Sequence, residues 1–363
     1  MRKIIFLILS VFLAFTFALS GCSCEASSYL EFENGATTNI KTERLVYSVE
    51  YTDTYKGIVC AQSINKDLVP KYENGQLVIE YDSTGRSLPS GITQHIKFDN
   101  ITTFNYIKTV FSIDVVVGEG QSEQRFNDKI ISEVYFYDAE WAFAPVYSKT
   151  TVKNTYIAMS SSQIATDQNI YEYTSTYKNE KFALTKKYYK ADANENVNLV
   201  DIEQDDFISK LKPLSGNGNS YEYERRKTID NVQLLFIARN INLKKGKSKS
   251  IPTITYMYNQ AKSMLITNNS QSSVVFDQLK FQLNNNLQTL ENVNMPVNNL
   301  FLAMDGTEQV GLTKYLTLQN AKVGDIENYA IPVEYAEPIM ENQSFNTVGA
   351  LVYKLKEINI TTK

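Results

Sequence analysis

The clearest pattern in this sequence is Phe104-Asn105-Tyr106-Ile107-Lys108-Thr109-Val110-Phe111-Ser112-Ile113-Asp114-Val115-Val116-Val117. Side chains of an extended strand alternate between two faces, which places on one face Ile107, Phe111, Ile113, Val115 and Val117. At about 3.3 Å per residue such a strand is roughly 45 Å long, well beyond the usual length. Strands of this kind are typical of a large, strongly curved antiparallel sheet.

The same period of two recurs along the rest of the chain. In Leu45-Val46-Tyr47-Ser48-Val49-Glu50-Tyr51, every second residue is apolar. Further strands are predicted at 130–137, 146–153, 170–178, 182–189, 221–227, 251–258, 273–283 and 350–358. The polar link Asn179-Glu180 predicts a β-hairpin between the third and fourth of these ranges.

Two segments interrupt the strand pattern. Residues 191–220 are rich in Asn, Asp, Ser and Gly, and we expect one short surface helix there, at 205–211. Residues 232–238 follow Asp230-Asn231, and either Asp230 or Asn231 can cap a helix that begins there. The segment is apolar nearly all round, which predicts a buried helix; a buried strand is the alternative. The fold class is therefore mainly β: a large curved antiparallel sheet, like a half-barrel, with one buried and one short surface helix.

The N-terminus predicts export. A basic start, Met1-Arg2-Lys3, precedes a short apolar run and Leu19-Ser20-Gly21-Cys22, the arrangement of a secretory signal peptide. The last four residues resemble the lipobox of bacterial lipoproteins, in which the Cys thiol receives lipid before cleavage. The alternative is an uncleaved anchor helix, for which the run is short. We therefore expect a signal peptide at 1–21, a tether at 22–40 and a body at 41–363 with a polar insertion at 191–220. Lipid on Cys22 would hold the protein on a membrane, outside the cytoplasm.

The charge composition limits the classes of partner that this protein can bind. The chain has 40 acidic and 36 basic side chains, without the basic excess that nucleic acid requires, so we predict no nucleic-acid partner. Besides Cys22 there are Cys24 and Cys60, which an exported protein either pairs or leaves as free thiols.

Catalytic and metal-binding motifs are weak. The single histidine, His95, leaves no multi-histidine zinc site, and no Gly-x-Ser-x-Gly turn supplies a nucleophile. Asp138 and Glu140, beside Trp141, are candidates for acid–base cleavage of a sugar bound on the indole ring, although sheet ends commonly carry such residues.

One loop resembles a calcium-binding loop. Its spacing places oxygen ligands at Asp192, Asn194, Asn196 and Glu203. Val197 occupies the position that calls for glycine, so a polar surface loop is the simpler interpretation. We predict no cofactor.

Tyrosines recur in pairs two residues apart, which places each pair on one sheet face. Such rings either line a groove for an apolar ligand or pack across strands. The pairs are Tyr135/Tyr137, Tyr171/Tyr173, Tyr221/Tyr223 and Tyr256/Tyr258.

A partial family resemblance lies in the string that runs from Ile229-Asp230-Asn231-Val232 through Arg239 to Leu243-Lys244-Lys245-Gly246. It is similar to the Asp, apolar helix, Arg and Leu-x-x-Gly string of an uncharacterised family of bacterial envelope proteins, related to outer-membrane lipoprotein carriers with a half-barrel (clam) fold. The resemblance implies structural roles for Asp230, Arg239 and Gly246, a curved sheet over a helix, and handling of lipid or lipoprotein. It transfers no catalytic residue, and the chain departs from the family in its length and in the 191–220 insertion.

These observations favour a non-enzymatic, lipid-anchored envelope protein whose curved sheet binds an apolar ligand or a partner protein. A carboxylate-dependent hydrolase of cell-wall or extracellular glycans is one alternative, and a structural surface lipoprotein without ligand is the other.

Overall fold

The computed structural model describes the chain over residues 39–53, 70–92, 101–118, 120, 123–137, 143–159, 164–178, 181–191, 211–213, 219–222, 228–239, 241, 243–255, 262–304, 308–318, 329–340 and 347–363. The chain divides into two compact units, Met1–Glu31 and Phe32–Lys363, and the described residues all belong to the second. None of the helices among these residues is long and apolar enough to cross a membrane.

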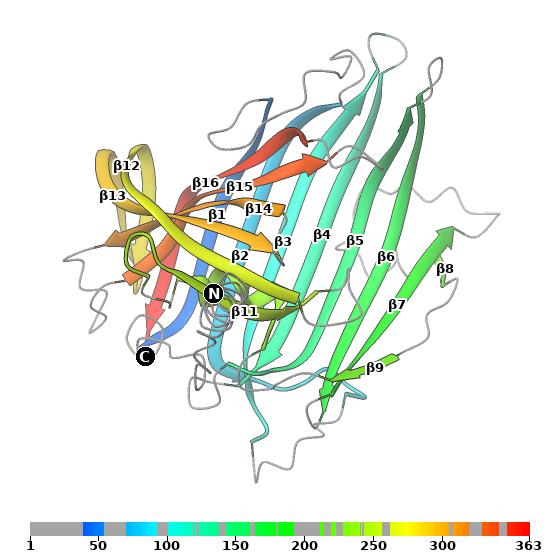
Figure 1. Ribbon diagram of the computed structural model, residues 1–363, viewed down its shortest axis with the longest axis horizontal. Coiled ribbons are helices and arrows are strands. Elements are labelled where there is room, and N and C mark those ends of the chain that lie inside the picture. Colours follow the sequence, from blue (N-terminus) through cyan, green and yellow to red (C-terminus); the bar gives the residue numbers. More distant parts are fainter. Residues whose placement is uncertain are drawn as a thin grey trace, which may run out of the picture. The chain divides into compact units, whose positions relative to one another are not determined.

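The second unit is built on one 16-stranded sheet that does not close (Figure 1). Its first half comprises β1 (Ile40–Thr52), β2 (Lys71–Arg86), β3 (Phe104–Val117), β4 (Gln124–Phe136), β5 (Pro145–Met159), β6 (Ile164–Lys178), β7 (Lys181–Ala191), β8 (Leu211–Pro213) and β9 (Asn219–Glu222). The second half comprises β10 (Ile229–Asp230), β11 (Ser248–Ile254), β12 (Lys262–Leu283), β13 (Asn286–Met304), β14 (Glu308–Leu318), β15 (Tyr329–Met340) and β16 (Thr347–Thr362).

Neighbouring strands in the sequence are mostly neighbours in the sheet. The order runs from β10 through β16 to β1 and on to β8, with β9 paired to β7. All pairings are antiparallel except β10 with β11 and β12 with β16, so the sheet is predominantly antiparallel, as predicted, with two short parallel pairings. The mainly β class and the single large curved sheet are confirmed, and β3 has the predicted bounds.

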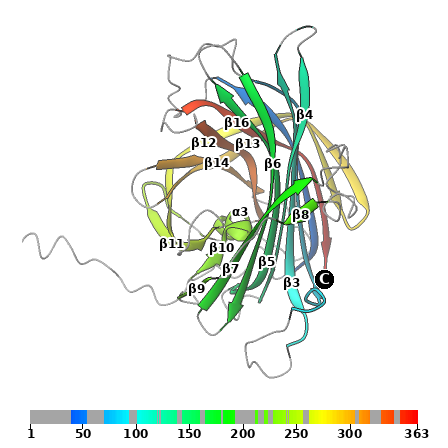
Figure 2. The same cartoon turned by 90° about the vertical axis from the view of Figure 1, so that its right-hand side faces the viewer.

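The sheet is strongly curved. The rings of Phe111 in β3 and Tyr353 in β16 have centroids 6.0 Å apart, although β1 and β2 separate their strands. Gly75 of β2 lies at an irregularity in the register with β3. A Cβ at Gly75 would lie 2.5 Å from the Val49 carbonyl oxygen, so a larger residue would force the two strands apart. Because the sheet curves, it has a concave side, and the helix lies on that side (Figure 2).

The buried helix is confirmed. A 3-10 turn, η4 (Asn231–Gln233), leads into α3 (Leu234–Ala238). Phe236 faces the sheet, with its ring centroid 4.5 Å from that of Tyr81, 6.0 Å from Phe136 and 6.1 Å from Phe143. This aromatic cluster joins the helix to β2, to β4 and to the residues before β5.

Several elements differ from expectation. The strands β2, β13, β14 and β15 were not predicted, and the polar 191–220 segment contributes β8 and the start of β9, which pair with β7. The rest of β9 overlaps the strand predicted at 221–227. The predicted surface helix at 205–211 lies outside the described residues apart from Leu211, which begins β8.

Candidate functional site

The carboxylate of Asp230 fixes the start of the helix. It caps η4 by accepting a hydrogen bond from the Val232 backbone N–H at 2.9 Å. It also accepts hydrogen bonds from the Ser148 hydroxyl at 2.6 Å and from the Tyr177 hydroxyl. Burial raises the pKa of Asp230, and these three donors oppose that rise by stabilising the charged form. Asp230 therefore joins the helix to β5 and β6.

Gln233 completes a reciprocal cap with Asp230. Its side-chain oxygen accepts a hydrogen bond from the Asp230 backbone N–H at 2.9 Å, and its amide nitrogen donates to the Phe143 carbonyl at 2.8 Å. A capping box of this kind satisfies backbone donors that a helix start leaves unpaired.

Arg239 fixes the other end of the helix. One of its terminal nitrogens donates to both carboxylate oxygens of Glu43 in β1, at 2.7 and 3.0 Å. The two side chains are 1% and 2% exposed, so this ion pair lies fully within the core. The guanidinium carbon also lies 4.5 Å from the centroid of the Phe236 ring, a cation–π contact.

Gly246 lies in the turn between the helix and β11. Its φ of 76° belongs to the left-handed region, which favours glycine. Its N–H donates to the Asn268 carbonyl at 2.7 Å, which ties the turn to β12. Of the predicted structural residues, Asp230 and Arg239 thus hold the helix, and Gly246 shapes the chain that leaves it.

Tyr171 and Tyr173 lie on the concave side, on the same face as the helix. Alternation along β6 places them with Tyr177, whose hydroxyl bonds Asp230. Their rings stack at 6.1 Å, and Tyr171 meets Tyr188 of β7 edge-on at 4.9 Å. Both tyrosines of the pair are half-buried, whereas Tyr188 is 42% exposed.

A continuous row of register partners extends from these tyrosines across five strands. We call it the concave row, and it consists of Phe111, Ile130, Val152, Tyr171 and Tyr188. The next row toward the helix is more polar and consists of Thr109, Ser132, Thr150, Tyr173 and Lys186. The sheet thus presents an apolar line beside a polar one.

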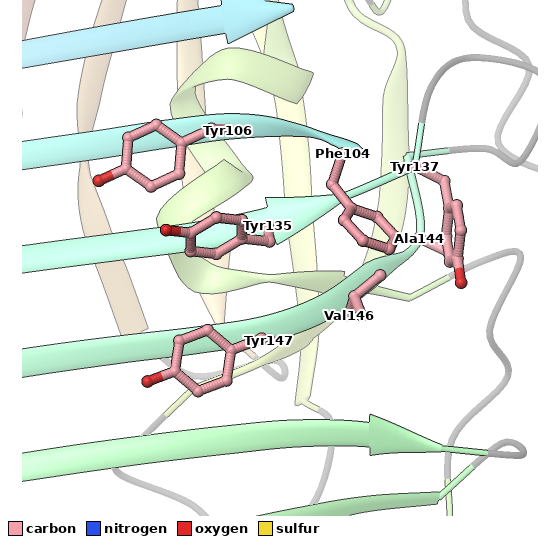
Figure 3. Packing of buried hydrophobic residues seen from close by; sticks show 7 residues of the cluster. All are labelled: Phe104, Tyr106, Tyr135, Tyr137, Ala144, Val146 and Tyr147. Carbon is pink, nitrogen blue, oxygen red and sulfur yellow. The ribbon is translucent and has the colours of Figure 1, made fainter. Parts of the chain in front are cut away.

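Tyr135 and Tyr137 lie elsewhere. Tyr135 alternates with Val134 and Phe136, which face the helix, so its ring lies on the opposite face. There it forms a row with Tyr106 and Tyr147, with ring centroids 4.9 and 5.9 Å apart (Figure 3). The cluster around this row contains Phe104, Tyr137, Ala144 and Val146, and the partly buried Leu88, Ile92 and Ile101 pack against it.

The opposite-face row is a packed cluster with a polar margin. The Tyr106 hydroxyl donates to Glu133 at 3.0 Å. The Arg86 guanidinium lies 5.1 Å from the centroid of the Tyr106 ring. Burial raises the pKa of Tyr147 to about 12. The four candidate ligand-lining tyrosines therefore divide between two faces, and only Tyr171 and Tyr173 lie with the helix.

The remaining predicted site residues lie outside the described residues. They are Cys22, Cys24, Cys60, His95, Asp138, Glu140, Trp141, Asp192, Asn194, Asn196 and Glu203. Within the described ranges, no group of three or more His, Cys, Asp or Glu side chains is placed to hold a metal ion.

Sequence reasoning missed three side chains of this region: Glu43, Gln233 and Lys186. The sequence did contain a signal for Glu43. It lies two and four residues before the apolar Leu45 and Tyr47, so the strand pattern places its carboxylate on the buried face. The sequence contained no signal for Lys186, because its partner Tyr173 belongs to β6 and the two meet only when β6 and β7 pair.

Comparisons with known proteins include a distant structural neighbour. No family model and no curated protein matches the sequence. A crystal structure of a beta-barrel-like protein of the domain of unknown function DUF1849, from Brucella abortus, aligns with a TM-score of 0.44 and 8% sequence identity. The alignment covers 89% of this chain and 98% of that chain. It assigns neither a ligand nor an activity to this chain.

Proposed function

We propose that this protein is a lipid-anchored, extracytoplasmic binding protein that holds an apolar molecule on the concave row. The observation that carries this proposal is the row itself, which places Phe111, Ile130, Val152, Tyr171 and Tyr188 in one register line across β3–β7. Val152 is buried, Tyr188 is 42% exposed and the other three are partly exposed. Apolar side chains left partly exposed in such a line favour an apolar partner.

The position of the helix supports this assignment. The helix packs on the part of the concave face around Tyr81, whose register partner in β3 is Ile107. Phe111 lies four residues further along β3, or about 13 Å at the rise of a strand. The helix therefore covers one part of the face, and the concave row crosses another.

The anchor is supported by the lipobox-like sequence that ends at Cys22. Because lipid attachment to the thiol precedes cleavage in such proteins, Cys22→Ala is expected to leave a longer, unprocessed precursor. Gel mobility and detergent partitioning of wild type and variant measure this. A Cys22→Ala protein that is cut and partitions like wild type would refute the lipid anchor and leave the binding proposal standing.

Ligand binding is tested by titrating the body, residues 32–363, with an environment-sensitive fatty-acid probe and competing natural lipids. The wild-type body is expected to bind the probe saturably, and Tyr171→Ala/Tyr173→Ala to bind it at least about fivefold more weakly. Loss of two aromatic contacts of about 0.5–1.5 kcal/mol each accounts for this factor. The matched control is Thr176→Ala, on the same strand but the other face, which should bind like wild type.

Circular dichroism of every variant shows that the sheet is intact. A folded wild-type body that does not bind the probe saturably would contradict the proposal and favour a structural or glycan-directed role.

A further inference from the structure

Lys186 is a cation at the margin of the concave row. It lies on β7 opposite Tyr173, and its ammonium nitrogen lies 6.0 Å from the centroid of that ring. Tyr188, the last member of the concave row, lies two residues after Lys186 on β7 and therefore on the same face. The positive charge and the β7 end of the apolar line are thus adjacent.

The neighbouring Lys187 has a different environment. Alternation places it on the opposite face, where its ammonium lies 3.4 Å from the Glu172 carboxylate. The same carboxylate lies 2.8 Å from Lys149. Within the described part of the chain, no carboxylate pairs with Lys186. The charge of Lys187 is therefore balanced by Glu172, whereas the contact of Lys186 among the described residues is with the ring of Tyr173.

The length of the concave row suits an extended acyl chain. Four steps between neighbouring strands cover about 19 Å, and one leaflet of bilayer hydrocarbon is about 15 Å deep. At the far end, Phe111 meets Tyr353 of β16, which bounds the row. The nearby Glu337 carboxylate accepts hydrogen bonds from Tyr335 and Tyr353. The two ends therefore differ, with a lysine at the β7 end and, beyond Phe111, tyrosines that hydrogen-bond the Glu337 side chain of β15.

We infer that the ligand is a single-chain, long-chain carboxylate whose acyl chain lies along the concave row and whose headgroup pairs with Lys186. This inference rests on the proposed function and names the chemical class of its ligand. Charge complementarity selects the carboxylate over an uncharged amphiphile of equal length, and it fixes the direction of the chain in the site.

The test uses the full chain in mild non-ionic detergent and two photoactivatable probes of equal length, a fatty acid and the matching fatty alcohol. Wild type is expected to be labelled saturably by the acid, with competition by unlabelled acid. Lys186→Gln should weaken acid binding about 1.4- to fivefold, the range for one exposed ion pair, and leave alcohol binding unchanged. Lys187→Gln is the matched control and should retain wild-type preference.

The outcomes separate this inference from the proposed function. Equal acid binding by wild type and Lys186→Gln, with saturable labelling by both probes, overturns the carboxylate assignment while the apolar site stands. A loss of preference in Lys187→Gln equal to that in Lys186→Gln overturns it as well, because it indicates a general charge effect. Absence of saturable labelling by either probe removes the proposed function itself.

Discussion

Arg239→Met is expected to lower the free energy of unfolding by about 3–5 kcal/mol, because it leaves the Glu43 carboxylate buried without its cation. The two side chains are 1% and 2% exposed, so water does not replace the lost partner. The substitution also removes the cation from the Phe236 ring, 4.5 Å away. Chemical denaturation followed by circular dichroism measures the change, as a lower midpoint with an unchanged slope.

Two further variants identify the cause. Glu43→Leu/Arg239→Met replaces the ion pair by apolar side chains, and it should be more stable than Arg239→Met because no unpaired charge remains. The matched surface control is Arg44→Met, next to Glu43 along β1. Its side chain is 42% exposed and pairs with Glu357 at 3.0 Å, so its loss should cost no more than about 1 kcal/mol. If Arg239→Met is no more costly than Arg44→Met, the buried pair does not hold the helix.

The strands that alternation predicts are those with one consistently apolar face. For β3 the predicted and observed bounds coincide because no Gly or Pro interrupts its fourteen residues. In β2 the pair Asn74-Gly75 interrupts the pattern, and it is there that the register with β3 slips. In β15 Pro332 lies at a register shift with β14, so a residue unable to donate a backbone hydrogen bond is tolerated. In the sequence alone, Asn-Gly pairs and prolines indicate loops, so strands that contain them are not predicted.

The candidate site was predictable within single strands and not between them. Spacing of two established that Tyr171 and Tyr173 share a face, but the register of β4 with β3 and β5 decides that Tyr135 faces the other way. The pairing of Arg239 with Glu43, 196 residues earlier, likewise depends on the assembled sheet. The local string from Asp230 to Gly246 indicated the helix, and only the tertiary structure supplied its partners.

Phe236→Ala is expected to lower the free energy of unfolding by about 3–5 kcal/mol, because the ring fills the space between the helix and the sheet. Its neighbours are Tyr81, Phe136 and Phe143, with ring centroids between 4.5 and 6.1 Å away. The same denaturation experiment measures the loss. Phe236→Leu keeps most of the volume and should cost clearly less than Phe236→Ala. Leu287→Ala, at a side chain that is 64% exposed, should change stability by no more than about 0.5 kcal/mol.

The contact between the Arg239 guanidinium and the Phe236 ring means that the two substitutions should affect stability jointly. Residues in contact do not contribute independently, so the effects of Phe236→Ala and Arg239→Met should not add in the double variant. Additive losses would show that the ring and the cation act separately, and a Phe236→Ala cost below about 1 kcal/mol would show that the ring is not part of the core. Either result would contradict a helix held on the concave face by one aromatic and ionic cluster.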